Sequence, residues 1–147
     1  MATVEDIRRL VALDNGLASL STLRGDGSVH VSVVNAGVID HPLASGPVAA
    51  FVARPGTRKL SNLRARPSAT LQWRAGWAWV AAEGQTEVIG PDEPLEGYDL
   101  DDLPSLLRGI YVAAGGQHED WAEYDRVMAA EKRVAVLLRP TRIYVNP

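Results

Sequence analysis

Residues 17–39 read LASLSTLRGDGSVHVSVVNAGVI, a pattern that predicts two β-strands joined by a tight turn. Leu17 to Leu23 is the first strand, and Ser28 to Ile39 is the second. Asp26-Gly27 supplies the positive φ that a hairpin turn needs. One face of the second strand carries Val29, Val31 and Val33, and the other carries His30, Ser32 and Val34. We therefore expect an antiparallel hairpin here.

Four more strands and four helices are predicted around this hairpin. The strands are Val48 to Ala53, Ser68 to Arg74, Trp77 to about Ile89, and Val134 to Val145, the last bent at Pro140. The helices are one that Thr3 caps and Asn15-Gly16 ends, a short basic one that stops before Pro67, Leu103 to Ala114, and Glu119 to Lys132. Gly90 to Asp102 is a polar loop, interpreted as a solvated excursion.

This order of elements predicts an α+β fold with flanking helices. Strands linked by hairpins, with the helices set apart, indicate a mainly antiparallel sheet. Six strands rich in Val and Ala favour closure into a barrel, because closure removes exposed strand edges. A length of 147 residues suits a single domain, residues 1–147, with its own hydrophobic core.

Composition argues against several kinds of site. Cysteine is absent, which removes disulfides and thiol nucleophiles, and the three histidines lack the spacing of a metal motif, so no metal site is predicted. A net charge of -3 argues against a general nucleic-acid binder. The apolar runs fall far short of the ~20 residues that span a bilayer. No secretion signal is visible, so a cytoplasmic location is expected.

The window from His41 to Ala82 contains no acidic residue. It holds six of the 15 basic residues and none of the 18 acidic ones, so its charge is +6 while the rest of the chain carries -9. The basic residues are Arg54, Arg58, Lys59, Arg64, Arg66 and Arg74. An acid-free basic segment in an acidic protein indicates a local anion site, with a solvated basic face as the alternative.

The centre of this window predicts the start of a short helix. Pro55-Gly56 makes a turn, Thr57 is expected to cap the helix, and Arg58-Lys59 lie in its first turn. A helix start offers free backbone N–H groups and the positive end of the helix dipole. The segment therefore suits a phosphate or a carboxylate.

No acid–base or nucleophile motif is visible, and no residue is assigned as catalytic. There is no Gly-x-Ser-x-Gly elbow, no Gly-x-Gly-x-x-Gly turn after a strand, and no Walker loop. Hydride transfer fits such a chain, because a bound cofactor carries out that chemistry while the protein supplies position. Trp73, Trp77 and Trp79 lie near the basic window. They either pack in the core or line a pocket for a planar ring.

Six segments carry a family resemblance. Residues 58–71 read RKLSNLRARPSATL, residues 76–84 read GWAWVAAEG, and residues 16–23 read GLASLSTL before Asp26-Gly27. They resemble the basic, Asn-Leu, Pro-x-Ala and Glu-Gly features of the pyridoxamine-phosphate-oxidase-like split β-barrel family. Residues 118–124, HEDWAEY, with KRV at 132–134 and IYV at 143–145, are similar to the actinobacterial branch that uses the deazaflavin coenzyme F420.

The resemblance implies a homodimer with two cofactor sites at the subunit interface and a small molecule as substrate. Lys59 stands where the family's phosphate-binding lysine stands, with Arg58 and Thr57 beside it. Arg54 occupies the rim, where it would meet the acidic oligoglutamate tail of the coenzyme.

The same resemblance assigns residues to the ring of the cofactor. Val52 would border the ring, and Asn35 would lie near its reactive face. Trp77 and Trp79 would line the cofactor across the dimer, and Arg133 would approach from the last strand of the partner subunit.

Four functions remain open at this stage. The first is an F420-dependent reductase that passes a hydride to an enone or a quinone. The second is an F420 carrier without turnover. The third is a flavin enzyme that uses FMN, including a pyridoxamine phosphate oxidase or a heme-degrading relative. The fourth is a dimeric scaffold whose basic segment binds an acidic partner. The choice of F420 over FMN depends on the resemblance alone.

Overall fold

Strands β1 (Leu17–Leu23) and β2 (Val29–Asp40) form the predicted hairpin and pair antiparallel. Gly27 has a φ of 86°, in the left-handed region that favours glycine. The Asp26 carboxylate accepts a hydrogen bond of 2.9 Å from the Ser28 backbone N–H. The Asp-Gly turn therefore joins the strands as its residue types predict.

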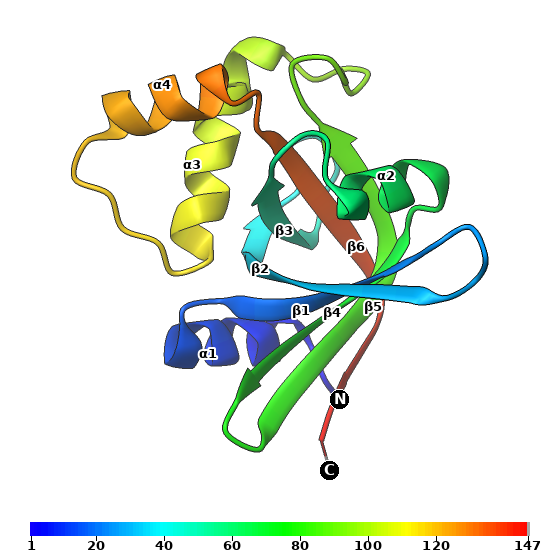
Figure 1. Ribbon diagram of the computed structural model, residues 1–147. Helices are drawn as coiled ribbons and strands as arrows, with labels where there is room; N and C mark the ends of the chain where they lie inside the picture. The colour runs from blue at the N-terminus through cyan, green and yellow to red at the C-terminus, as the bar shows by residue number, and fades with distance from the viewer. Residues whose placement is uncertain (147) are drawn as a thin grey trace.

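The other strands are β3 (Pro47–Ala53), β4 (Ser68–Ala75), β5 (Ala78–Ile89) and β6 (Val134–Val145). All six close into a barrel in the order β1-β2-β3-β6-β5-β4, and each neighbouring pair is antiparallel (Figure 1). This computed structural model describes residues 1–146, and within them the predicted α+β split barrel is confirmed. Closure depends on the pairing of β3 with β6, which places Ala53 opposite Val134.

The predicted bend at Pro140 is a β-bulge. The register between β5 and β6 shifts so that Arg142 lies opposite Glu83 while Pro140 lies opposite Gly84, which leaves Thr141 as the extra residue. A bulge accommodates proline because the ladder hydrogen bond that proline cannot donate is already interrupted there.

Two helices close the ends of the barrel. Helix α1 (Val4–Asp14) buries Ile7 and Leu10 against the barrel interior, and helix α2 (Arg58–Ala65) buries Leu60 and Leu63. Both helices present these side chains at helical spacing. The same interior holds Phe51, Leu20, Leu71 and Trp73. Trp73 is only 1% exposed, so for this tryptophan the core-packing alternative is correct.

Helices α3 (Leu103–Ala113) and α4 (Trp121–Ala130) cover the outer face of β3 and β6 and form a second apolar cluster there (Figure 1). Helix α3 crosses β2 at Gly37, where a Cβ atom would lie 2.3 Å from the Ala113 carbonyl oxygen. Only glycine permits that approach. No helix within residues 1–146 has the length and apolar character needed to cross a membrane.

Two predictions in this region differ from the structure, one in the bounds of a helix and one in the content of a loop. Helix α4 begins at Trp121 rather than Glu119, because the Asp120 carboxylate accepts from the Glu123 N–H at 3.1 Å and caps the helix there. The loop predicted from Gly90 to Asp102 contains a short 3-10 helix, Leu100–Asp102, that leads directly into α3.

The outer face of the β1–β2 hairpin is apolar and uncovered. Val29, Val31 and Val33 are 51%, 59% and 70% exposed, which is unusual for side chains of this kind on a strand. Beyond Ala36, β3 pairs with β2, but the stretch of β2 that bears these valines pairs only with β1. The hairpin therefore extends past the closed part of the barrel (Figure 1).

Candidate functional site

The β3–α2 connection carries the basic segment to the end of the barrel. Pro55-Gly56 makes the predicted turn, and Gly56 has a φ of 79°. Thr57 is the N-cap residue of α2, but its hydroxyl donates to the Arg54 carbonyl oxygen at 3.1 Å instead of accepting from the helix. The predicted Thr cap is therefore wrong in its side-chain role. No side chain caps the first turn of α2, so its N–H groups remain available to a ligand.

The basic residues of the acid-free window have different partners. Three of them hold parts of the fold together: Arg64 pairs with Glu93, Arg66 donates to the Leu23 carbonyl, and Arg74 donates to the Gly76 carbonyl. Arg58 is exposed and Lys59 is half-buried. Neither forms an ion pair with any residue in 1–146. The positive charge that is free to meet an anion is therefore concentrated at the open start of α2.

A cavity of about 270 Å³ lies between the barrel and the α3–α4 pair. It brings together three of the predicted residues from separate elements: Asn35 of β2, Val52 of β3, and Arg133, which precedes β6. The residues that sequence reasoning missed are Ile110, Tyr111, Tyr124 and Met128. Their only sequence signal was an apolar and aromatic face at helical spacing, which is also what core packing produces.

Glu131 connects the basic segment to this cavity. Its carboxylate lies 2.8 Å from the Arg133 guanidinium and 3.9 Å from that of Arg54. Two positive side chains therefore share one carboxylate, and the rim of the cavity keeps a surplus of positive charge. Arg133 is 20% exposed, so its charge faces a partly dry surface where Coulomb attraction is less screened.

Two members of an aromatic cluster, Tyr111 and Tyr124, line the helical side of the cavity. Tyr111, His118, Trp121 and Tyr124 contact one another with ring centroids 5.1–6.4 Å apart. Burial raises the pKa of Tyr124 to about 12, with a further contribution from Tyr111. The Tyr124 hydroxyl also donates to the Leu107 carbonyl at 3.3 Å. Tyr124 therefore stays protonated near neutral pH and acts as a wall rather than as an acid–base group.

Asn35 has a structural role that limits what it offers a ligand. Its terminal amide lies 2.7 Å from the Asn15 carbonyl oxygen and 2.9 Å from the Ala114 carbonyl oxygen. Two acceptors at these distances assign its NH₂ group to that side. Asn35 thus ties β2 to the ends of α1 and α3, and its own carbonyl oxygen is left to accept a hydrogen bond from a ligand.

Trp77 and Trp79 lie away from the start of α2. Trp77 belongs to the β4–β5 turn rather than to the predicted strand, and it is 93% exposed. Trp79 is on β5 and packs edge-on against Tyr144 at 6.0 Å. Strand β4 runs from the end of α2 to this turn and spans about 25 Å, at about 3.3 Å per residue. The turn and α2 therefore lie at opposite ends of β4 (Figure 1). Within one protomer, the structure does not bring these tryptophans to Lys59.

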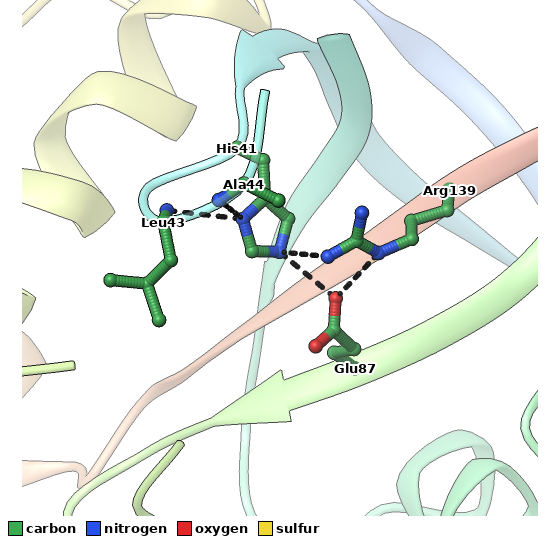
Figure 2. Close-up of polar contacts among 5 residues, drawn as sticks. All are labelled: His41, Leu43, Ala44, Glu87 and Arg139. Carbon is green, nitrogen blue, oxygen red and sulfur yellow. Dashed lines mark hydrogen bonds and ion pairs between the residues drawn. The ribbon is translucent and has the colours of Figure 1, made fainter. Parts of the chain in front are cut away.

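A second polar cluster is buried under the β2–β3 loop (Figure 2). His41 accepts at Nδ1 from the N–H groups of Leu43 and Ala44, at 3.1 and 2.9 Å, so the Nε2–H donates to Glu87 at 2.9 Å. Arg139 donates to the same carboxylate at 3.0 Å. Burial opposes ionisation of Glu87, but the hydrogen bonds from His41 and Arg139 outweigh it and lower its pKa. Both imidazole nitrogens are occupied, so this cluster fixes the loop and offers no free general base.

One family model matches nearly the whole length of the chain. The model described as Pyridoxamine 5'-phosphate oxidase matches residues 4–146. That range includes the start of α2 and every residue that lines the cavity.

Solved structures with the same fold have low sequence identity to this chain. A conserved hypothetical protein from Mycobacterium tuberculosis is 21% identical, with a TM-score of 0.65, and the match covers 99% of this chain and 84% of that one. An F420 reductase is 16% identical, with a TM-score of 0.60 and coverages of 91% and 93%. A pyridoxamine 5'-phosphate oxidase-related, FMN binding protein from Nostoc punctiforme is 13% identical, with a TM-score of 0.62 and coverages of 96% and 80%. At these identities the likeness shows the fold alone.

Proposed function

This chain belongs to the pyridoxamine 5'-phosphate oxidase family, and from that premise we propose that it binds the deazaflavin coenzyme F420 and acts as an F420-dependent oxidoreductase. When bound, the coenzyme supplies the hydride that reduces an unsaturated small molecule such as an enone or a quinone. The solved F420 reductase of the same fold supports the choice of coenzyme. The residues of this chain bind and orient the coenzyme and exclude water from its ring.

The observation that carries the proposal is the pair of uncommitted cations at the open start of α2. Lys59 and Arg58 meet no carboxylate within residues 1–146, and no side chain caps the helix there. A phosphodiester placed at this point accepts from the backbone N–H groups of the first turn and from both side chains. Each charge-assisted contact of this kind contributes ~1.5–3 kcal/mol where water is excluded.

The cavity beside β3 suits the ring end of the coenzyme. Val52 and the aromatic wall of Tyr111 offer flat apolar surface, and the Asn35 carbonyl oxygen accepts from a ring N–H. Arg54 and Arg133, which share Glu131, hold acidic groups at the rim. The site thus offers an apolar surface for the ring of F420 and positive charges for its phosphodiester and its carboxylates.

We further propose that the chain forms a homodimer whose second copy completes the site. The exposed valine stripe of β2 and the exposed Trp77 are apolar surfaces of the kind that mark protein interfaces. Trp77 and Trp79 are too far from Lys59 to share a ligand with it in one protomer. A second copy that covers the valine stripe would bring its tryptophans to the coenzyme of the first.

Two alternatives have specific support. FMN would use Lys59 and the start of α2 for its phosphate in the same way, and an FMN-binding protein shares the fold. A carrier that binds F420 without turnover is favoured by the absence of a proton donor among the described lining residues. The tyrosine hydroxyls of the wall donate to carbonyl oxygens, Tyr111 to Gln117 and Tyr124 to Leu107.

Cofactor titration tests the proposal directly. Tryptophan fluorescence of the purified full chain is expected to be quenched by F420 at low micromolar concentration, and more weakly by FMN. Absence of quenching by either cofactor at high micromolar concentration would contradict the proposal. Oxidation of reduced F420 in the presence of enones and quinones then separates a reductase from a carrier.

A matched pair of variants locates the site. Lys59→Ala is expected to raise the dissociation constant of F420 about tenfold or more, because it removes one charge-assisted contact. Arg9→Ala removes an equal charge from α1 and is expected to bind as the parent does. Arg9 is exposed and, within residues 1–146, pairs only with Asp6, at 3.4 Å. Equal affinities of the two variants would show that the coenzyme does not use the start of α2.

A further inference from the structure

A second cavity of about 370 Å³ lies between α3, α4 and the segment before α3. Met128 and Arg133 line both this cavity and the one beside β3, so they form the wall between the two. The second cavity is mostly apolar and is lined by Pro91, Leu100, Leu103, Pro104, Leu107, Met128 and Ala129. Its size and lining are typical of small-molecule sites, which span roughly 300–1,000 Å³. The segment predicted as a solvated polar loop therefore supplies one of its walls.

Lys132 stands at the mouth of this cavity in a backbone conformation that disfavours lysine. The N–H groups of Lys132 and Arg133 donate to the carbonyls of Ala129 and Met128 at 3.1 and 3.0 Å, which is the Schellman arrangement at a helix end. Lys132 occupies the left-handed position with a φ of 51°, where glycine is the usual residue. Within residues 1–146 the other non-glycine residue with positive φ is Asn15, a type that tolerates it. A lysine at this position costs backbone free energy, which a role of its side chain in binding would offset.

The charges around the cavity leave one positive charge in excess. Lys132 lies 3.8 Å from Asp92, which is 80% exposed, so this pair is weak. Asp125, which also lines the cavity, is held by Arg108 through two hydrogen bonds. Glu131 is shared by Arg133 and Arg54. Among the lining residues two cations, Lys132 and Arg133, thus face one carboxylate, Asp125, which Arg108 already holds.

The geometry points to a binding site for an apolar monocarboxylate in this cavity, separate from the cofactor site. The carboxylate pairs with Lys132 at the mouth, and the hydrocarbon body lies against Leu100, Leu103 and Leu107. Burial of the body supplies most of the affinity, because transfer of apolar surface from water is favourable in proportion to its area. The positive end selects an anion over a neutral or cationic molecule of the same shape.

Calorimetric titration of the full chain with three ten-carbon probes tests the charge requirement. Decanoate is expected to bind one site per chain, decan-1-ol to bind at least about tenfold more weakly, and decyltrimethylammonium to give no saturable heat. Failure of decanoate to bind below about 1 mM would overturn the proposal, as would equal binding of the cationic probe.

Lys132→Gly gives two readouts of opposite sign. Glycine removes the backbone penalty at the left-handed position, so the melting temperature is expected to rise by about 2–4 °C. The same change is expected to weaken decanoate binding about tenfold and leave the affinity for decan-1-ol unchanged. An unchanged dissociation constant for decanoate in Lys132→Gly would overturn the role of this side chain.

Two further variants separate this site from the cofactor site. Ala129→Leu fills the cavity from an exposed helix position at little cost to helix propensity, and it is expected to abolish decanoate binding in a folded protein. Lys59→Ala is expected to bind decanoate as the parent does. Decanoate binding by Ala129→Leu, or its loss in Lys59→Ala, would contradict the placement. Neither outcome depends on whether the chain binds F420.

Discussion

Helices α1 and α2 both begin just after a threonine, yet their first turns differ. In α1 the Thr3 hydroxyl accepts from the Glu5 N–H at 3.2 Å, and the Asp6 carboxylate accepts from the Thr3 N–H at 2.8 Å. In α2 the Thr57 hydroxyl donates away from the helix, and the first turn holds Lys59 where α1 holds an acid. One helix start is closed by its own side chains and the other is left open.

The contrast shows that the same N-cap residue type is used in two ways, with a side-chain cap in α1 and without one in α2. Acidic residues at a helix start interact favourably with its dipole, and basic residues there do not. The α1 start therefore stabilises the fold, whereas the α2 start gives up that stabilisation and presents an electropositive surface instead. Four experiments test this difference between the two helix starts.

The largest effect is expected from charge reversal at the open start. Lys59→Glu should weaken F420 binding about a hundredfold or more, because an attractive contact becomes a repulsive one. It should also raise the free energy of unfolding by ~0.3–1 kcal/mol, because a carboxylate suits the helix dipole at that point. Fluorescence titration and urea denaturation measure the two effects. The reverse change in α1, Glu5→Lys, should lower stability by a similar amount and leave F420 affinity as it is.

Removal of the side-chain cap of α1 is expected to lower the stability of the fold without changing F420 binding. Thr3→Ala removes the hydroxyl that accepts from the first turn of α1, so the free energy of unfolding should fall by ~1 kcal/mol. The matching decrease in melting temperature is ~3 °C for a chain of this size. A normal affinity for F420 is expected. A variant as stable as the parent would mean that water satisfies the first turn of α1 equally well.

A change in ionic strength should affect F420 binding at the start of α2 more than it affects the stability of the fold, and this test needs no substitution. Raising salt from about 0.05 M to about 0.5 M shortens the Debye length about threefold, so the attraction between the α2 start and an anionic coenzyme weakens. The dissociation constant of F420 should rise by about fivefold, while the urea midpoint changes little. Salt-independent binding would indicate that apolar contacts dominate.

The smallest effect is expected at Thr57. Thr57→Ala removes a hydrogen bond to the Arg54 carbonyl at an exposed turn, and surface changes of this kind alter stability by less than about 0.5 kcal/mol. Urea denaturation should therefore separate Thr57→Ala from Thr3→Ala. Equal losses in the two variants would mean that the Thr57 hydroxyl caps α2 in solution.

Much of the fold was predictable because its signals are local. The Asp-Gly turn, the alternation along β2 and the caps of α1 depend on residues a few positions apart. Proline at position 140 predicted an irregularity in β6, and the structure has a bulge there. The basic start of α2 was also visible, as an acid-free run of basic residues.

The side chains that make up the candidate site were less predictable, because their contacts are with residues far away in the sequence. Arg64, Arg66 and Arg74 look the same as Lys59 in sequence, and only the fold shows that each is held by another residue. The tyrosines of the cavity wall were indistinguishable from core residues. Trp77 was placed on a strand because the turn could have begun at either of two neighbouring residues.

The amino-acid sequence by itself determined the strands, the helices and the position of the basic helix start, because propensity, periodicity and capping act between near neighbours. The three-dimensional fold was needed to show which charged side chains form no ion pair within residues 1–146 and which side chains line the same cavity. It was also needed to show that Lys132 lies at the mouth of the second cavity. These features depend on contacts between residues that are far apart in the sequence. Such contacts form only when the barrel closes and the helices pack against it.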